Sequence, residues 1–351
     1  MRVLVAMSGG VDSSVAAARL KAAGHDVTGV TLKLWGGESD SGCCSVADVE
    51  DARRVAAQLG IPHYTFNFSD DFSASVVDPY VEAHAAGLTP NPCVECNRSI
   101  KFGRLLERAE ATGFDAVATG HHARVVVSPA GDGTRRHELA RGHDGGKDQS
   151  YVLYMLSEAD LARLRLPVGE MTKAEVRAEA AALGLRTAAK PESMEVCFIT
   201  RGGRERFLAE RGVLRPGAVV DPSGRAVGRH EGAALFTVGQ RRGLGVAAGE
   251  RRYVLDVDAA RAAVTVGPYE DLLRDEVQVD GLRFVAGAPP SPSDWLLVEV
   301  RAHGTPFDGR LDATGSWSGV VRFARPQPRV APGQVVALYR GDVLLGGGLA
   351  R

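Results

Sequence analysis

The chain has 351 residues, which is longer than one hydrophobic core usually supports, so we expect two or three domains. With 44% hydrophobic and 24% charged residues it has the composition of a globular protein, and no apolar stretch approaches the roughly 18 residues that span a bilayer. We therefore expect no contact with a membrane, and the net charge of -1 argues against a protein that coats nucleic acid.

Strand-like and helix-like runs alternate over the first part of the chain, which is typical of a parallel sheet covered by helices. In chain order we expect a strand at 2–7, a helix at 11–23, a strand at 26–35, a helix at 46–59, a strand at 61–68, a helix at 100–112 and a strand at 114–119. Further on, Thr172 and Glu175 form a capping box that begins another helix, and Gly184 ends it. The alternation predicts a doubly wound α/β domain.

The character of the chain changes after about residue 202, where short β runs broken by turn residues replace the helices. These runs include a hairpin at 253–266 and strands at 295–300, 319–323 and 335–339. We therefore expect three domains: the α/β domain over residues 1–201, a small, mostly β domain over 202–271, and a C-terminal β-barrel over 272–351.

The run Ser8–Ser14, of sequence SGGVDSS, lies between the first predicted strand and the first predicted helix. A glycine-rich turn at such a place presents backbone N–H groups and the positive end of the helix dipole to an anion, and the serines add hydroxyl donors. Asp12 suits a magnesium ion that bridges phosphates. The run contains neither the GxxxxGK[ST] nor the GxGxxG pattern, which excludes a Walker-type loop and a dinucleotide site here. It predicts a nucleotide phosphate site of another kind.

The five cysteines are an odd number. The first motif begins at Ser8 and leaves no room for a signal segment, so we expect a cytoplasmic protein without structural disulfides. Cys96 lies just before the predicted helix start near Ile100, where a helix dipole favours the thiolate. Cys197 lies in the apolar run 195–199, where simple core packing is the alternative to reactivity.

The run SGGVDS resembles the signature of the ATP pyrophosphatases, which cleave ATP between its α and β phosphates and transfer AMP to an oxygen atom. Six stretches together resemble the bacterial tRNA-specific 2-thiouridylases, which replace the C2 oxygen of the wobble uridine with sulfur. In chain order these are MSGGVDSSV, TPNPCVECNRSIKFG, ATGHHARV, GGKDQSYVLYML, EVCFI and FTVGQRRGLG. The resemblance implies an ATP pyrophosphatase domain of α/β type, a small central domain and a C-terminal β-barrel.

The resemblance also implies roles for individual residues. Cys197 would carry sulfur as a persulfide, and Cys96 would assist adenylation as an acid and then attack that persulfide, which leaves a disulfide between the two. Asp12 completes the implied catalytic set. The residues implied for ATP are Ala6, Met7, Ser8, Gly9, Gly10, Val11, Asp12, Ser13, Leu32 and Gly120. Those implied for tRNA are Asn91, Pro92 and Cys93 at the target base, and Lys147, Asp148 and Gln149 elsewhere.

The implied cofactors are ATP and Mg²⁺. The implied partners are the tRNAs for lysine, glutamate and glutamine, together with a sulfur donor that is either a cysteine desulfurase or a sulfur-relay protein. The residues do not distinguish these two donors, because both would load the same cysteines.

The chain departs from the family pattern at two places. Many members carry Asp where this chain has Cys93, and the Arg-Tyr pair that the family offers to RNA corresponds to His303–Gly304 here. Over residues 201–252, eleven arginines and no lysine stand against five acidic residues. Within that basic segment, Gln240 and Arg241 are candidates for contact with tRNA phosphates, and a solvated arginine-rich surface is the alternative.

Cys93 and Cys96 have the CxxC spacing of a metal clamp, which leaves metal sites open as alternatives. Zinc would also need Cys43 and Cys44, although adjacent cysteines are poorly spaced for a zinc ribbon. An iron–sulfur cluster would use Cys197 as a further ligand. We favour neither, and expect no metal held by the cysteines.

His121 and His122 follow the last predicted strand of the α/β domain, where ligand-binding residues gather; a capping or surface position is the alternative. Two rival functions stay open. An ATP pyrophosphatase that uses ammonia on a small molecule would give Cys96 and Cys197 no role. A metal- or redox-sensing module that binds nucleotide for stability would bind ATP without releasing pyrophosphate.

Overall fold

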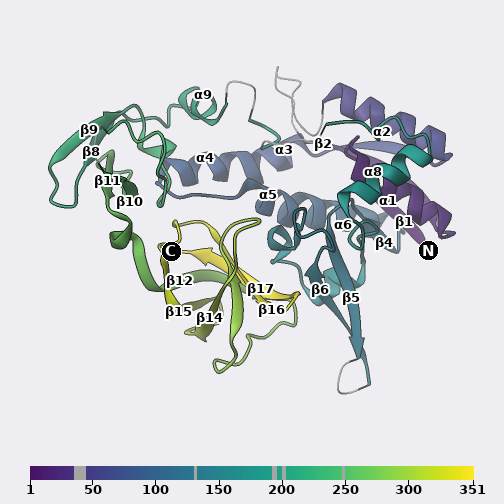
Figure 1. The fold of residues 1–351 in the computed structure, drawn as a ribbon. Helices are drawn as coiled ribbons and strands as arrows, with labels where there is room; N and C mark the ends of the chain where they lie inside the picture. The colour runs from purple at the N-terminus through teal and green to yellow at the C-terminus, as the bar shows by residue number, and fades with distance from the viewer. Residues whose placement is uncertain (35–44, 130–132, 192–195, 200–202, 247–249) are drawn as a thin grey trace.

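The computed structural model describes residues 1–34, 45–129, 133–191, 196–199, 203–246 and 250–351. Its strands form a five-stranded, a four-stranded and an eight-stranded sheet. In Figure 1 the four-stranded sheet lies at one end of the molecule, α1 and α2 lie at the other, and the yellow-green strands of the third sheet lie below α4. None of the helices in the described ranges combines the length and hydropathy needed to cross a bilayer.

The N-terminal sheet is parallel and has the strand order β3-β2-β1-β4-β7. Its strands are β1 (Arg2–Ala6), β2 (Asp26–Lys33), β3 (His63–Asn67), β4 (Ala116–Ala118) and β7 (Leu164–Arg165). Strand β1 lies at the centre and is almost fully buried because both faces of the sheet are covered. The predicted strands at 2–7, 26–35, 61–68 and 114–119 are confirmed, with shorter bounds.

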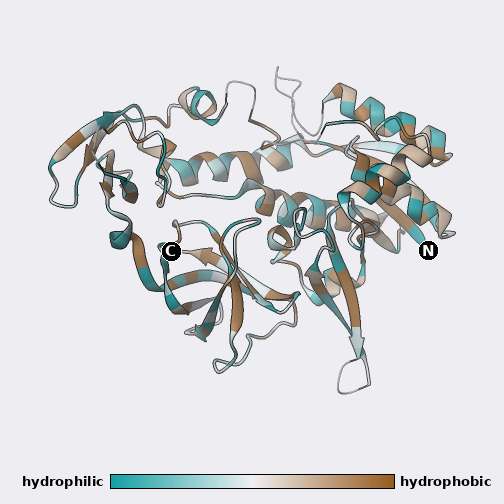
Figure 2. Ribbon diagram, viewed as in Figure 1, coloured by the Kyte–Doolittle hydropathy of each residue, from teal (hydrophilic) through white to brown (hydrophobic). Residues whose placement is uncertain are grey.

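Helices cover this sheet on both faces. Val3 and Val5 of β1 pack on one side with α1 (Val11–Ala22), α2 (Val46–Leu59) and α8 (Lys173–Ala182). Leu4 of β1 packs on the other side with the helical segment that ends in α6 (Leu105–Ala111). In Figure 2 these helices show hydrophilic and hydrophobic residues in turn along their length, as amphipathic covering helices do. The predicted doubly wound α/β domain is confirmed.

The helix that carries Cys96 begins earlier than the sequence pattern predicted. It runs through α5 (Pro92–Glu95), the π-helical η2 (Cys96–Arg104) and α6, whereas we expected a start near Ile100. Asn91 caps it, because its side-chain oxygen accepts a hydrogen bond from Cys93 N at 3.1 Å, and Pro92 occupies the first helical position. The expected placement of Cys96 at a helix N-terminus is therefore wrong, since Cys96 lies one turn inside.

Several short elements complete the described chain, and the sequence pattern predicted none of those between residues 69 and 85. They are α3 (Ser69–Phe72), η1 (Ser73–Val77), α4 (Asp78–Ala85), η3 (Ser150–Leu153), α7 (Glu158–Ala162), α9 (Gly203–Ala209), η4 (Ala233–Leu235) and η5 (Tyr269–Leu272).

The middle sheet has the order β10-β11-β8-β9 and a small core around Val219, Val254 and Val264. Its strands are β8 (Gly217–Val220), β9 (Ala226–His230), β10 (Tyr253–Asp258) and β11 (Ala263–Gly267). The hairpin expected at 253–266 is confirmed as the antiparallel pair β10 and β11. The middle region is thus small and mostly β, as predicted.

The C-terminal strands form a closed barrel, because the first of them, β12, pairs with both β15 and β17. The strands are β12 (Leu273–Phe284), β13 (Leu296–Glu299), β14 (Phe307–Ala313), β15 (Ser318–Pro328), β16 (Val335–Arg340) and β17 (Val343–Ala350). Inward residues such as Val279, Leu311 and Val321 fill the barrel interior. The predicted β-barrel is confirmed.

A hairpin of the α/β domain extends the barrel sheet, which the sequence pattern did not predict. It consists of β5 (Ala123–Pro129) and β6 (Arg135–Arg141), and β6 pairs with β17 (Figure 1). Next to it, the Ser150 and Tyr339 hydroxyls lie 3.0 Å apart, and the Tyr151 hydroxyl donates to Val335 O at 3.0 Å. These buried contacts fix the barrel against the segment that follows the hairpin.

Candidate active site

The loop between β1 and α1 folds back on itself around the Ser13 hydroxyl. That hydroxyl accepts a hydrogen bond from Ser8 N at 3.2 Å and donates to Gly10 O at 3.2 Å. Gly10 is the N-cap of α1 and has no side chain to satisfy the first N–H groups of the helix. The loop therefore leaves backbone donors and the helix dipole available to an anion.

A cavity of about 320 Å³ opens on this loop, at the C-terminal ends of β1, β2 and β4. From the set predicted to bind ATP, its lining contains Ala6, Met7, Ser8, Gly10, Val11, Asp12, Ser13, Leu32 and Gly120. Gly9, also predicted, lies outside the described lining, and its carbonyl accepts a hydrogen bond from Lys190 Nζ at 2.9 Å. The structure thus brings together residues 6–13, 32 and 120, which are far apart in the sequence.

Two glycines are required by close approach of backbone segments. A Cβ atom at Gly120 would lie 2.6 Å from Ser13 N, so β4 could not end this close to the loop with any larger residue. Gly9 has a φ of +73°, and a Cβ atom there would collide with the Asp48 carbonyl of α2. Gly120 therefore shapes the cavity lining by its lack of a side chain, and Gly9 lets the loop pack against α2.

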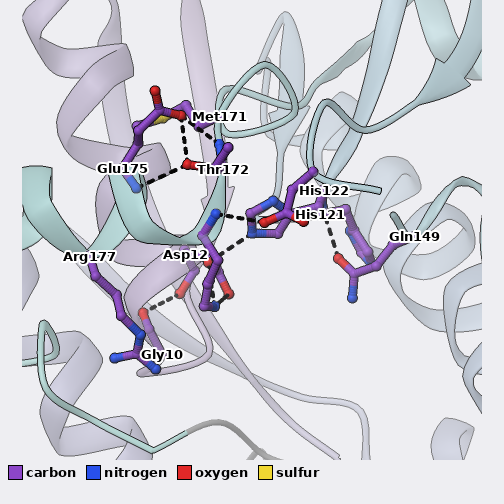
Figure 3. Close-up of polar contacts among 12 residues, drawn as sticks. Gly10, Asp12, His121, His122, Gln149, Met171, Thr172, Glu175 and Arg177 are labelled. Carbon is purple, nitrogen blue, oxygen red and sulfur yellow. Dashed lines mark hydrogen bonds and ion pairs between the residues drawn. The ribbon is translucent and has the colours of Figure 1, made fainter. Parts of the chain in front are cut away.

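Asp12 lies between two donors from distant segments. Its Oδ2 is 2.6 Å from Lys173 Nζ, and its Oδ1 is 3.1 Å from His122 Nε2. Figure 3 shows Asp12 and His122 facing each other, with Gln149 on the other side of His122. Burial opposes ionisation of Asp12, but the hydrogen bonds from His122 and Lys173 outweigh it and lower the pKa. Asp12 is therefore an anion at neutral pH.

Lys190 connects the loop to α2. Its ammonium lies 2.9 Å from Gly9 O, 2.6 Å from Asp48 Oδ1 and 2.7 Å from Asp51 Oδ2. Burial works against the charge of Lys190, but the two carboxylates more than compensate and raise its pKa. Lys190 is thus a permanent cation that holds the loop in place at the edge of the cavity.

The cavity carries more cationic than anionic side chains. Among the residues that the structure describes, four lysines line it, against the carboxylates of Asp12 and Asp48. The lysines are Lys101, Lys147, Lys173 and Lys190. This excess, together with the loop amides, suits a polyphosphate such as that of ATP.

Sequence reasoning did not single out Lys101, Lys173, Lys190 or Asp48 as nucleotide residues. Lys101 could have been predicted, because it belongs to the stretch TPNPCVECNRSIKFG that carries the family resemblance. Lys173 and Lys190 gave no such signal: one follows a helix cap and the other precedes a proline, and both patterns are common where nothing binds.

His121 and His122 are buried and both line the cavity, so a surface position is wrong for either. Burial lowers the pKa of His121 well below its usual value, and the ring is neutral. Its Nδ1 lies 2.7 Å from the Thr119 hydroxyl. The His122 ring contacts the Asp12 carboxylate instead, so the two neighbouring histidines have different hydrogen-bond partners in the site.

The two cysteines predicted to handle sulfur share one apolar cluster. Cys96 is buried in it, and Cys197 is partly buried and packs against it. Lys101 lies five residues after Cys96, which is one hydrogen-bonded turn of the π-helix η2, and reaches the nucleotide cavity. The element that positions Cys96 is therefore also part of the nucleotide site.

Cys93, two positions inside the same helix, is exposed. Cys43 and Cys44, which a zinc site would have used, lie outside the described residues. In the described ranges, no group of three or more His, Cys, Asp or Glu side chains is placed to hold a metal ion.

Known proteins match the chain from end to end. Residues 1–201 match a domain family described as a tRNA methyl transferase HUP domain, residues 205–268 a tRNA methyl transferase PRC-barrel domain, and residues 274–350 an aminomethyltransferase beta-barrel domain. A tRNA-specific 2-thiouridylase MnmA from Roseiflexus castenholzii is 50% identical over 99% of this chain and 98% of that protein. Proteins of the same name from Chloroflexus aggregans and Sorangium cellulosum are 51% and 50% identical, over 99% of this chain and 97% and 91% of theirs.

The chain belongs to the tRNA-specific 2-thiouridylase family. The domain descriptions mention methyl transfer, whereas the relatives matched over their full length are named for thiolation. The full-length matches decide the family because they include all three domains and both cysteine segments. The family predicted from the sequence is confirmed.

The residues predicted to contact tRNA, by the 2-thiouridylase resemblance or from the basic segment, occupy three places. Asn91 and Cys93 lie at the start of the helix that carries Cys96, with Pro92 buried between them. Gln240 and Arg241 lie in an exposed loop of the middle domain, where Gln240 donates to Arg242 O at 2.9 Å.

Lys147 and Gln149 line the nucleotide cavity, and Asp148 between them points inward. Only 5% of the Asp148 side chain is exposed, and it lies 3.0 Å from Arg141 Nη1. Gly142 N and Ser150 N donate to the same carboxylate. Asp148 therefore braces the turn that presents Lys147 and Gln149.

Proposed function

We propose that this chain forms 2-thiouridine at wobble position 34 of tRNA, with ATP as the activating substrate. The observation that carries the proposal is the helix 92–111, in which Cys96 and the cavity residue Lys101 lie one π-turn apart. This helix carries a buried thiol and also lines the cavity that opens on the loop 8–13, as sulfur transfer to an adenylated base requires. Full-length relatives named 2-thiouridylases support the same activity.

In the first step, the C2 oxygen of the uridine attacks the α-phosphorus of ATP, and the bond to the β-phosphate oxygen breaks. The base then carries AMP on oxygen, and pyrophosphate leaves. The amides of the loop 8–13 and the lysines of the cavity stabilise the negative charge that develops on pyrophosphate. Lys190 acts indirectly, by holding the loop in place: its ammonium donates a hydrogen bond to the Gly9 carbonyl.

The cavity also fits Mg²⁺, which usually uses one or two protein carboxylates and completes its shell with phosphate oxygens and water. Asp12 lines the cavity, and its lowered pKa keeps it ionised. We propose that Asp12 holds the ion once ATP is bound. Bound Mg²⁺ would neutralise charge on the leaving pyrophosphate.

In the second step, we propose that Cys197 carries the terminal sulfur of a persulfide. The Cys96 thiolate attacks the inner sulfur, the S–S bond of the persulfide breaks, and a Cys96–Cys197 disulfide forms with release of hydrosulfide. Hydrosulfide adds to C2, AMP leaves, and loss of a proton gives the thiocarbonyl. A thiol reductant then restores both cysteines. That both pack on one apolar cluster supports this pairing.

The proposed tRNA contacts are those predicted from the resemblance and from the basic segment, with one refinement. We propose that Asn91, Pro92 and Cys93 meet the target base and that Gln240 and Arg241 contact phosphates of the backbone. Lys147 and Gln149 would contact tRNA near the nucleotide, whereas the buried Asp148 would act by positioning them.

We further propose domain bounds of 1–201, 202–271 and 272–351, and a cytoplasmic site of action, where thiols stay reduced. The tRNAs would be those for lysine, glutamate and glutamine. The sulfur donor would be a cysteine desulfurase or a sulfur-relay protein. An iron–sulfur cluster is not part of the proposal.

The test uses the purified full-length chain with an unmodified tRNA transcript, ATP, Mg²⁺, a cysteine desulfurase and cysteine. We expect the wobble uridine to gain the mass difference of sulfur for oxygen, and AMP and pyrophosphate to appear. Pyrophosphate release on a small amine-accepting substrate, with an unchanged tRNA, would instead support the ammonia-using rival. ATP binding without any pyrophosphate release would support the nucleotide-stabilised sensor.

A further inference from the structure

The segment Gly142–Gln149, here called the coupling loop, contacts the nucleotide site at its C-terminal end and in its middle. At its C-terminal end, Gln149 and His122 exchange two hydrogen bonds: Gln149 N donates to His122 O at 2.8 Å, and His122 N donates to Gln149 Oε1 at 2.9 Å. The His122 ring then meets Asp12 Oδ1 at 3.1 Å. Figure 3 shows these groups in line, from Gln149 through His122 to Asp12.

The direction of the hydrogen bond between His122 and Asp12 follows from the chemistry of the carboxylate. A carboxylate oxygen accepts hydrogen bonds, so in the contact with Asp12 Oδ1 the Nε2 atom of His122 is the donor. The other ring nitrogen, Nδ1, is buried and has no hydrogen-bond partner in the described part of the chain. The orientation of His122 is therefore set by Gln149 on one side and Asp12 on the other.

A second connection reaches Asp12 through the middle of the coupling loop. Asp144 Oδ2 accepts a hydrogen bond from Lys173 N at 2.9 Å, at the first residue of α8. The Lys173 side chain then reaches Asp12 at 2.6 Å. Both connections therefore end on the same carboxylate.

The coupling loop is exposed between its anchored ends. His143, Gly145, Gly146 and Gln149 are exposed, whereas Asp148 is buried and ties the loop to Arg141. A partner that binds the exposed part would restrict the loop between its anchored residues. The restriction would be transmitted to His122 and Lys173 through the hydrogen bonds of Gln149 and Asp144.

We infer that the coupling loop links tRNA binding to ATP binding, with His122 and Lys173 as the positioning residues that carry the coupling to Asp12. The inference rests on the proposed function, in which Lys147 and Gln149 contact tRNA. Binding of tRNA fixes the loop, His122 and Lys173 then hold Asp12 in the position that receives ATP, and by linkage each ligand tightens the other.

The experiment measures the dissociation constant of α,β-methylene ATP, which is not cleaved between its α and β phosphates, with and without saturating tRNA transcript. For the native chain we expect tRNA to tighten the analogue by about tenfold, within the usual range of allosteric coupling. His122→Phe keeps a ring of similar size but removes the donor, and should reduce this factor to about one. His122→Gln keeps an N–H donor and should restore most of it.

Asp144→Ala, which breaks the second connection, should lower the factor without abolishing it. His137→Phe in the β6 strand is the matched control, since His137 lies in the hairpin and outside the cavity lining, and should leave the factor unchanged. In every variant the affinity for tRNA alone should match that of the native chain, and the thermal unfolding midpoint records any stability lost with the contact to Asp12. These two readouts separate coupling from general damage to the fold.

A native coupling factor in His122→Phe would overturn the inference. So would equal weakening of the analogue with and without tRNA, because His122 would then act only as part of the ATP site. A native chain that forms 2-thiouridine but shows no coupling would overturn the inference and leave the proposed function standing. A native chain that forms no 2-thiouridine would overturn the proposed function itself.

Discussion

Lys173 at the start of α8 lies 2.6 Å from Asp12 in the first turn of α1, so one ion pair joins the two helices across the nucleotide loop. The contact is only partly exposed: 12% of the Lys173 side chain and 29% of the Asp12 side chain are accessible. This ion pair lies where the nucleotide loop, the coupling loop and α8 meet.

Lys173→Met should shift the acid unfolding of the protein. Burial, the largest effect on Asp12, opposes its ionisation, and the substitution removes one of the two donors that hold its pKa below 3.8. In the native chain, the stability from ionised Asp12 is complete above pH 3.8 and is lost as the pH falls through the lower, folded pKa. In Lys173→Met the folded pKa of Asp12 moves up toward 3.8, so the variant should be less stable at pH 7 and should lose less stability than the native chain as the pH falls to 3.

Urea unfolding of metal-free protein between about pH 7 and pH 3 measures this shift. Asp12→Asn, which cannot ionise, is the reference, and Lys173→Met should have little further effect on the pH profile in that background. Parallel profiles for the native chain and Lys173→Met would show that Lys173 does not control Asp12.

Gly120→Ala should damage the nucleotide site through the backbone. The added Cβ atom would lie 2.6 Å from Ser13 N and 2.9 Å from Asp12 Cβ, so β4 or the loop has to shift. We expect ATP binding to weaken at least about tenfold, equivalent to about 1.4 kcal/mol, and stability to fall by about 1–3 kcal/mol. Calorimetric titration and thermal unfolding measure the two effects.

Gly145→Ala is the matched control for stability, because a Cβ atom there meets nothing within 4 Å. Its unfolding midpoint should equal that of the native chain. Native ATP affinity in Gly120→Ala would mean that the close approach of β4 to the loop is unimportant for the site.

Asp148→Asn should destabilise the protein although Asp148 lies beside predicted tRNA contacts. The carboxylate is 5% exposed and pairs with Arg141 at 3.0 Å, and the amide would place donors against the guanidinium. We expect a loss of about 3 kcal/mol in urea unfolding. Asp342→Asn is the control: that side chain is 71% exposed, lies 3.7 Å from Arg124, and should cost at most about 1 kcal/mol. Equal costs would contradict the bracing role of Asp148.

Cys93→Ser should leave sulfur transfer within about twofold of the native rate, because Cys93 has no part in the proposed sulfur steps and serine keeps a small polar side chain at the position proposed to meet the base. Iron and zinc should be near zero in anaerobically purified native protein. Stoichiometric iron that is lost in Cys93→Ser would revive the cluster alternative.

Local patterns predicted the elements whose signals are themselves local. The capping box of Thr172 and Glu175 begins α8 as expected, and the helix at 46–59 has the predicted bounds, because caps and apolar periodicity act within one turn or two. The early helix start at Pro92 also had a local signal, an Asn-Pro pair, which the apolar pattern after Ile100 obscured.

The site itself combines local and distant contributions. The nucleotide loop was predictable because strand, glycines and helix are contiguous in the chain. Lys173 and Lys190 were not predictable, because each reaches the loop from a position more than 160 residues further along the chain. The pairing of β6 with β17 likewise joins segments that lie far apart in the sequence. Such contacts depend on how distant segments pack together in the fold, and no single segment encodes that packing.

The central claim is that Cys197 delivers one sulfur atom for each ATP spent in activating the base. The most direct measurement quantifies AMP and 2-thiouridine in the same reaction, for the native chain and for Cys197→Ser. We predict equal amounts of the two products in the native reaction. Cys197→Ser should form no 2-thiouridine while it still binds α,β-methylene ATP with native affinity, since Cys197 lies outside the described cavity lining. Formation of 2-thiouridine by Cys197→Ser at the native rate would contradict the account.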